Sequence, residues 1–141
     1  MHEKSGTVLI VDDEVFNIEL LCELLGDKYD TMVAKNGHQA LKRISNGALP
    51  DLVLLDIMMP EMDGYEVCET LKKNPATANL PVIFISALSQ ENDVCKGLKL
   101  GAVDYITKPF HPELVKLRVD NHIKLKRMSD QVLALNKNND S

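Results

Sequence analysis

The stretch that decides the fold is Asp51-Leu52-Val53-Leu54-Leu55-Asp56-Ile57-Met58-Met59-Pro60-Glu61-Met62-Asp63-Gly64. Its four consecutive apolar residues, 52–55, are bounded by prolines and a glycine, which is typical of a short strand buried on both faces of a parallel sheet. Asp56 follows directly, so we expect it where the strand ends. A carboxylate beside an apolar strand is costly to bury without a positive partner. The rest of the chain must therefore supply a cation near Asp56.

Four further short apolar runs predict four more strands. They cover residues 7–11, 29–34, 82–85 and 102–106. Between and after them, apolar residues recur at three- and four-residue steps, which predicts five helices, the last opening at Pro112. This alternation indicates an α/β fold with right-handed crossovers. We expect a doubly wound, flavodoxin-like five-stranded parallel sheet in the order 2-1-3-4-5, with helices on both faces.

Size, composition and charge exclude several classes of function. The chain has 141 residues, 45% of them apolar and 26% charged, which is ordinary for one soluble globular domain. Its net charge of −5 and pI near 5.3 leave no basic stripe, so we expect no direct binding to nucleic acid or to an acidic membrane surface. The sequence has neither a bilayer-spanning apolar run nor a signal peptide, so we expect a cytoplasmic protein.

Cysteine and histidine positions argue against a soft metal site. Cys22, Cys68 and Cys95 are odd in number and far apart, and each falls in a predicted helix. We therefore expect buried free thiols in a reducing compartment. The four histidines are equally scattered, so a histidine metal site is not expected.

Polar side chains follow four of the five predicted strands. Asp12 and Asp13 come after the first, Asp56 after the third, Ser86 after the fourth and Lys108 after the fifth. The carboxyl ends of parallel strands meet at one edge, where ligands bind in such sheets. Three carboxylates held together call for a divalent cation such as Mg²⁺, while an ammonium and a hydroxyl suit phosphate oxygens. This constellation predicts phosphoryl transfer to a carboxylate.

Each of these residues also has an ordinary structural interpretation. Two aspartates after a strand are often only a helix N-cap, and Ser86 could cap the helix that follows it. Lys108 could be a surface lysine beside a turn. The functional interpretation depends on finding all of them at the same sheet edge.

The sequence resembles a receiver domain of the two-component response regulators. Four stretches carry the resemblance, in the order and spacing of that family: residues 8–14, 51–64, 83–87 and 104–110. The resemblance covers residues 7–122. It implies a signalling phosphoacceptor that catalyses its own phosphorylation and dephosphorylation, not an enzyme with a separate substrate. The donor would be a phosphohistidine on a histidine kinase or a histidine phosphotransfer protein, and the receiver would control an output domain or partner.

The resemblance implies Asp56 as the phosphoacceptor. Mg²⁺, with Mn²⁺ as an alternative, would be bound by Asp13, by Asp56 and by the main-chain carbonyl of Met58, and by Asp12 mainly through water. Lys108 would pair with the phosphoryl group or with Asp56. The peptide between Lys108 and Pro109 is expected to be cis, an isomer that is rare except before proline.

The resemblance also implies a switch and a pair of positions that tune hydrolysis. Phosphorylation would draw Ser86 toward the phosphate and let Tyr105 move inward, which remodels the face of the fourth and fifth helices. Met58 and Leu88 stand where the family controls the access of water. Both are apolar, so we expect slow autodephosphorylation. The alternatives are that Tyr105 is a half-buried strand aromatic and that Met58 and Leu88 merely pack locally.

The last helix continues beyond the expected end of the receiver domain. Steps of four and three residues place one seam along it, at Leu114, Arg118, Asn121, Leu125, Met128, Val132 and Leu135. We therefore divide the chain into an N-terminal tail (1–6), a receiver domain (7–122), a helical extension that forms a coiled coil or a connector (123–136) and a disordered tail (137–141). A homodimer through the extension, or through the face of the fourth and fifth helices, is expected. The alternative is a long amphipathic helix folded against its own domain.

Three other classes of protein share parts of this pattern. A flavodoxin-like electron carrier needs a loop that cradles phosphate after the first strand, where Asp12-Asp13-Glu14 would repel it. A Mg²⁺-dependent phosphatase with an aspartyl-phosphate intermediate usually has an Asp-x-Asp motif, whereas Met58 lies two residues after Asp56. A receiver-like module that acts only through protein contacts tends to lack an acidic residue or the lysine.

Overall fold

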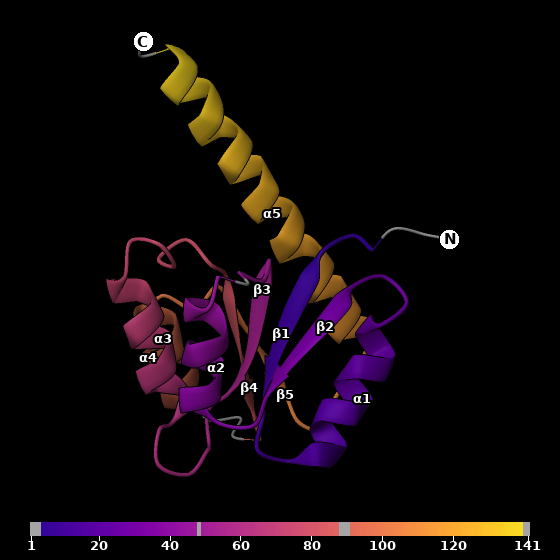
Figure 1. The fold of residues 1–141 in the computed structure, drawn as a ribbon. Coiled ribbons are helices and arrows are strands. Elements are labelled where there is room, and N and C mark those ends of the chain that lie inside the picture. The colour runs from indigo at the N-terminus through magenta and orange to yellow at the C-terminus, as the bar shows by residue number, and fades with distance from the viewer. Residues whose placement is uncertain (1–3, 48, 88–90, 140–141) are drawn as a thin grey trace.

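The structure, a computed structural model, describes residues 4–47, 49–87 and 91–139. Strands and helices alternate along the whole chain (Figure 1). The elements are β1 (Thr7–Val11), α1 (Val15–Leu25), β2 (Asp30–Ala34), α2 (Gly37–Ser45), β3 (Leu52–Asp56), α3 (Gly64–Lys73), β4 (Val82–Ser86), α4 (Glu91–Lys99), β5 (Asp104–Thr107) and α5 (Pro112–Asn139).

The five strands form one parallel sheet in the order β2-β1-β3-β4-β5, which confirms the predicted topology. Its register decides which residues meet at the carboxyl edge. Val11 pairs with Leu55, so the residues that follow them, Asp12 and Asp56, lie side by side at the ends of β1 and β3. On the next strands Asp56 pairs with Ile85, and Ser86 pairs with Thr107.

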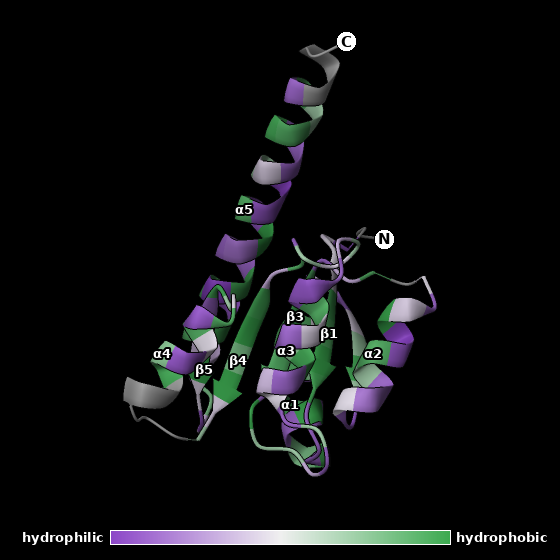
Figure 2. Cartoon of the chain, turned by 90° about the vertical axis from the view of Figure 1, so that its left-hand side faces the viewer, coloured by the Kyte–Doolittle hydropathy of each residue, from purple (hydrophilic) through white to green (hydrophobic). Residues whose placement is uncertain are grey.

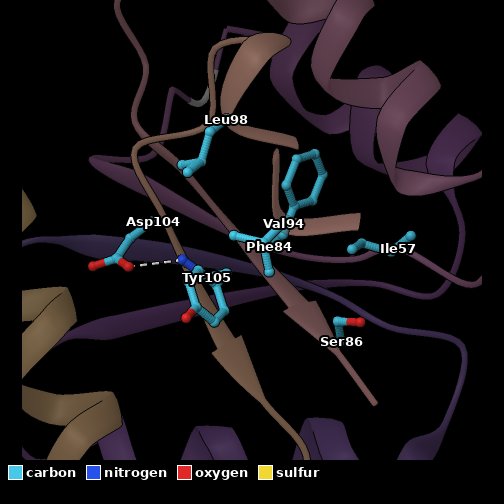
Figure 3. A pocket seen from close by; sticks show the side chains of 7 residues that line it. All are labelled: Ile57, Phe84, Ser86, Val94, Leu98, Asp104 and Tyr105. Carbon is cyan, nitrogen blue, oxygen red and sulfur yellow. Dashed lines mark hydrogen bonds between the residues drawn. The ribbon is translucent and has the colours of Figure 1, made fainter. Parts of the chain in front are cut away.

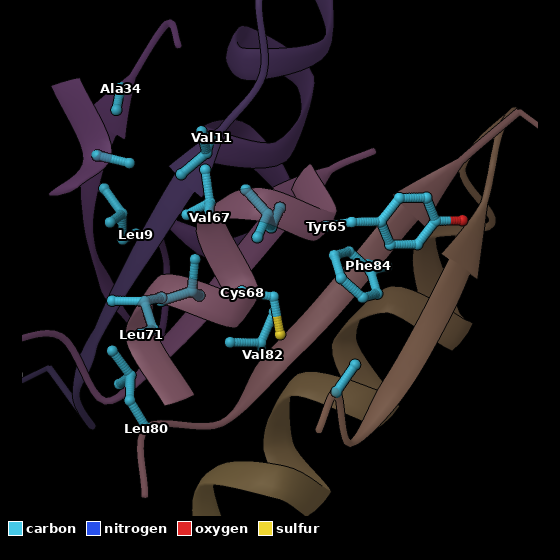
Figure 4. Close-up of a cluster of buried hydrophobic side chains, with 14 of the residues drawn as sticks. Leu9, Val11, Ala34, Tyr65, Val67, Cys68, Leu71, Leu80, Val82 and Phe84 are labelled. Carbon is cyan, nitrogen blue, oxygen red and sulfur yellow. The ribbon is translucent and has the colours of Figure 1, made fainter. Parts of the chain in front are cut away.

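Two apolar cores cover the two faces of the sheet because successive strand residues point to opposite sides. On one face, Leu9, Val82 and Phe84 pack with side chains from α3 (Figure 4), and side chains from α2 complete this core. On the other face, Ile10, Leu54, Ile83 and their neighbours pack with α1 and α5. Helices therefore cover both faces, as predicted from the uninterrupted apolar runs.

α5 packs on the sheet only along its first half. Val115, Val119 and Ile123 are buried against it, and the helix then projects past the sheet edge opposite the acidic site (Figures 1 and 2). The helix continues to Asn139, so the prediction of a disordered tail from residue 137 was wrong for residues 137–139. Extending an existing helix costs little, because each added residue gains a backbone hydrogen bond. Residues 140 and 141 lie outside the described part.

Two smaller predictions were also wrong. β5 begins at Asp104 and not at residue 102, because the N–H groups of Gly101 and Ala102 still bond back to carbonyls of α4. The three cysteines are free, but only Cys68 is buried. Cys22 is partly exposed at the margin of the core that α1 covers, and Cys95 is exposed on α4. Among the described helices, none combines the length and the apolarity needed to cross a bilayer.

Candidate functional site

Three carboxylates meet at the carboxyl edge of the sheet. Ligand atoms of Asp12, Asp13 and Asp56 lie within 4.8 Å of one another. Asp12 is fully buried and Asp56 is 3% exposed, whereas Asp13 lies open to solvent. The cluster therefore has a closed floor and one open side, through which water or a small ligand can enter.

The cation that Asp56 required is Lys108, which follows β5. Its Nζ lies 3.5 Å from Asp56 Oδ2 and 3.5 Å from Asp12 Oδ2. The Lys108 main-chain N–H donates to the Ser86 carbonyl at 2.9 Å, which fixes the start of the loop. The peptide to Pro109 is cis, as predicted. One ammonium thus stands between two buried carboxylates and leaves the cluster with an excess of negative charge.

Asp56 is poised between its protonated and its ionised form. Burial, followed by the neighbouring charge of Asp12, raises the pKa of Asp56 to about 7, while Lys108 and the Met58 main-chain N–H act in the opposite direction. That N–H donates to Asp56 Oδ1 at 3.3 Å. A carboxylate at such a site gains most from any further positive charge that enters the pocket.

The buried oxygens of Asp12 show what the pocket can hold. Asp12 Oδ1 accepts the main-chain N–H of Glu14 at 2.9 Å, whereas Asp12 Oδ2 has no hydrogen-bond partner among the described residues and meets only the Lys108 ammonium at 3.5 Å. An unsatisfied buried carboxylate oxygen is costly, and hard divalent cations prefer such oxygen ligands. The acidic pocket of Asp12, Asp13 and Asp56 therefore has the donor set of a metal site.

Gly64, which the sequence interpretation used only as a turn residue, brings α3 against the site. Asp63 caps α3 by accepting the Glu66 N–H at 2.9 Å, and the Gly64 N–H donates to the Ile57 carbonyl at 2.9 Å. A Cβ at Gly64 would lie 2.3 Å from the main-chain oxygen of Asp56. Only glycine permits this approach, and its place directly after a helix N-cap was the available signal.

The two predicted switch residues line one small cavity. Ser86 is buried and Tyr105 is half-buried. The cavity encloses about 10 Å³, room for about one water. In Figure 3 the Tyr105 hydroxyl points away from the Ser86 hydroxyl. The lining residues are Ile57, Phe84, Ser86, Val94, Leu98, Asp104 and Tyr105.

Tyr105 is also tied to α5 by a polar cluster that the sequence interpretation missed. The Arg118 guanidinium donates to the Tyr105 main-chain carbonyl and lies 5.4 Å from the centre of its ring. Asp104 pairs with His122 at 3.0 Å and with Arg118 at 3.7 Å. The spacing of four residues between Arg118 and His122 places both on one side of α5 and was the signal in the sequence.

Of the two predicted hydrolysis-tuning positions, Met58 and Leu88, only Met58 belongs to the described residues. The Met58 side chain is 65% exposed at the rim of the site, and Leu88 lies outside the described residues. The interpretation that Met58 merely packs locally finds little support in so exposed a side chain.

Comparison with known proteins gives one consistent answer. The family model of the response regulator receiver domain matches residues 8–120. A "Probable cyclic di-GMP phosphodiesterase" of Vibrio cholerae is 45% identical over 92% of this chain and 29% of its own length. The response regulator PleD of Caulobacter vibrioides is 39% identical over 91% of this chain and 28% of its own length. The chain thus spans less than a third of these relatives.

Solved structures agree with the sequence relatives. A response regulator from Chloroflexus aurantiacus superposes with a TM-score of 0.81 at 35% identity, covering 86% of this chain and 99% of the other. The receiver domain of a histidine kinase from Syntrophus aciditrophicus gives 0.78 at 37% identity, covering 85% and 91%. With its five-stranded fold and its acidic pocket, the chain belongs to the response regulator receiver domains, the phosphorelay signal receivers of two-component systems.

Proposed function

We propose that Asp56 accepts a phosphoryl group from a phosphohistidine on a histidine kinase or a histidine phosphotransfer protein. The phosphorylated receiver then controls an output domain or partner. The observation that carries this proposal is the position of Asp56, a buried carboxylate with Lys108 Nζ at 3.5 Å and two further carboxylates in the same cluster. The domain catalyses its own phosphorylation and dephosphorylation, because the residues that position and neutralise the phosphoryl group are its own.

In the transfer step, an ionised oxygen of Asp56 attacks the phosphorus of the phosphohistidine. The new P–O bond forms as the P–N bond breaks, and the imidazole nitrogen keeps the electron pair of that bond. Lys108 neutralises charge on the phosphoryl oxygens. Catalysis of the transfer consists of this positioning and charge compensation.

The resident metal is Mg²⁺, with Mn²⁺ as an alternative. Asp12, Asp13, Asp56 and the Met58 main-chain carbonyl would hold it, with Asp12 acting mainly through water. Once bound, the ion would supply positive charge that offsets the negative charge of the carboxylates and of the phosphoryl group. The fully buried Asp12 Oδ2, which has no hydrogen-bond partner among the described residues beside its ion pair with Lys108, supports this assignment.

The signal leaves the site through Ser86 and Tyr105. Ser86 moves toward the phosphoryl oxygens, and Tyr105 turns inward beside it. Both residues line one small cavity, and this adjacency supports the coupling between them. Arg118 holds the Tyr105 carbonyl and ring, so a movement of Tyr105 reaches α5 directly.

We assign the domain to the cytoplasm. The three cysteines are free, and Cys22 and Cys68 lie under opposite faces of the sheet, an arrangement suited to a reducing compartment.

Intact mass spectrometry tests the phosphoacceptor. The protein is incubated with Mg²⁺ and phosphoramidate, a small donor with a P–N bond, and compared with Asp56→Asn. We expect the wild type to gain the mass of one phosphoryl group and the variant to gain none. A matched control is Asp51→Asn, an aspartate of the same stretch at the opposite end of β3, which should still be phosphorylated. Equal labelling of wild type and Asp56→Asn would refute the proposal.

A further inference from the structure

One side of α5 carries a row of exposed apolar side chains. Val115, Val119 and Ile123 face the sheet and are buried. The opposite side exposes a set of large apolar residues, each between 36% and 62% accessible: Leu114, Leu117, Leu125, Met128, Val132 and Leu135. Since a helix turns about 100° per residue, this row faces away from the receiver's own core and cannot fold back on it. The amphipathic alternative, in which the helix covers its own domain, is therefore inconsistent with the geometry of α5.

The four residues at the projecting end follow the spacing of a two-stranded coiled coil. Leu125 and Val132 fall at a positions, and Met128 and Leu135 at d positions. We call these four residues the α5 seam. The projecting helix makes no hydrophobic core of its own, and an isolated helix of about 16 residues is marginal in water. Burying the α5 seam supplies the missing stabilisation.

We propose that the α5 seam is covered by the α5 seam of a second copy of this chain, in a parallel, in-register coiled coil. The flanking residues favour a self-pairing over a charged partner helix. Lys124, Ser129, Gln131 and Asn136 occupy the e and g positions, so these rows offer no acidic group and a single cation. A partner is therefore selected by its apolar row, and a second copy presents an identical one.

Two polar residues extend the seam toward the domain and favour the parallel orientation. Asn121 occupies the preceding d position, and only a parallel, in-register pair brings the two Asn121 amides together, where each satisfies the other. Arg118 occupies the a position before it. Its charge is held by Asp104 at 3.7 Å and by the Tyr105 carbonyl, so it does not oppose the approach of a second Arg118.

Adjacent residues provide a matched test. Val132 is 55% exposed within the α5 seam, and Leu133 is 54% exposed but turned by about 100° from it. We expect analytical ultracentrifugation to find a dimer of the wild type, a weakening of at least about tenfold in Val132→Glu and no change in Leu133→Glu. Met128→Glu provides a second seam variant, and circular dichroism shows whether each variant keeps its fold.

The outcomes separate the alternatives. A wild-type monomer at all concentrations, or equal effects of Val132→Glu and Leu133→Glu, overturns the proposal. A dimer that Val132→Glu and Met128→Glu leave intact assigns pairing to another face, such as that of α4 and α5, and also overturns it. Orientation is tested with Leu135→Cys in a Cys95→Ser background. Rapid disulfide formation supports the parallel, in-register pair, and its absence in a confirmed dimer contradicts that orientation.

Discussion

At the residue scale, the protonation of Asp56 depends strongly on its surroundings. Its ordinary pKa of 3.8 is raised to about 7 by burial and by Asp12. The same carboxylate must be ionised to act as a nucleophile. Near neutral pH the pocket therefore holds Asp56 partly protonated. Positive charge that enters the pocket favours the ionised, reactive carboxylate.

The raised pKa of Asp56 predicts how stability depends on pH without metal. Between about pH 4 and pH 7 the folded state binds a proton that the unfolded state has released, so this group stabilises the fold at low pH and loses that effect as pH rises through 7. The slope is at most about 1.4 kcal/mol per pH unit. Urea unfolding in EDTA at pH 5.5 and 8 should show a larger loss of stability in wild type than in Asp56→Asn. Parallel losses would contradict the assignment.

Metal binding should show the opposite dependence on pH. Protonated Asp56 cannot act as a ligand, so the affinity for Mg²⁺ should fall below pH 7, by up to about tenfold per pH unit. Calorimetric titrations at pH 6 and 8 measure the effect. Asp56→Asn should bind weakly at both pH values, and a wild-type affinity that is the same at pH 6 and 8 would rule out competition between proton and metal.

Met58 predicts the lifetime of the phosphorylated state. Its apolar side chain stands at the rim of the site and cannot orient a water. Met58→Asn introduces an amide that can, so the phosphoryl group should be lost several-fold faster. Mass spectrometry of the decay after removal of the donor gives the rate. Loss at an equal or slower rate in the variant would contradict this role.

At the scale of elements, the start of α3 controls the main chain of Asp56. A methyl group at residue 64 would lie 2.3 Å from the Asp56 carbonyl oxygen, so Gly64→Ala must displace the helix or the end of β3. We expect a loss of about 1–3 kcal/mol in unfolding free energy and slower phosphorylation. Gly47→Ala is the control, because Gly47 has a φ of 94° but open space around its added Cβ. Gly47→Ala should lower the free energy of unfolding without slowing phosphorylation. If both variants slowed phosphorylation equally, the role of Gly64 would be contradicted.

The strands were the most predictable elements because each is an apolar run between turn residues. Their order and the convergence of Asp12, Asp56, Ser86 and Lys108 followed from parallel topology, since polar residues at strand ends must share one edge. The packing of Gly64 against Asp56 could not be predicted in the same way, because it depends on the path of the loop between β3 and α3. The exposure of Cys95 was missed because it depends on the rotation of α4 on the sheet.

The same limit applies to α5. Its seam could be read from residue spacing alone, whereas the pairing of Arg118 and His122 with Asp104 required the position of α5 relative to β5. The helix is also longer than expected, because composition at residues 137–139 suggested disorder while backbone hydrogen bonding continued the helix.

At the scale of the whole molecule, the chemistry and the projecting helix occupy opposite edges of the sheet (Figure 1). Tyr105 lies between them, since it shares a cavity with Ser86 and bonds through its carbonyl to Arg118 on α5. The chain spans less than a third of its first relatives, and α5 points away from the acidic site.

The central claim is that one aspartate of this pocket accepts the phosphoryl group. It is tested most directly by trapping the phosphorylated protein with borohydride, which reduces an aspartyl phosphate to homoserine, and by sequencing its peptides by mass spectrometry. We predict homoserine at position 56 only when Mg²⁺ and the donor are both present. Homoserine at Asp12 or Asp13, or its absence under conditions in which the intact mass rises, would contradict the claim.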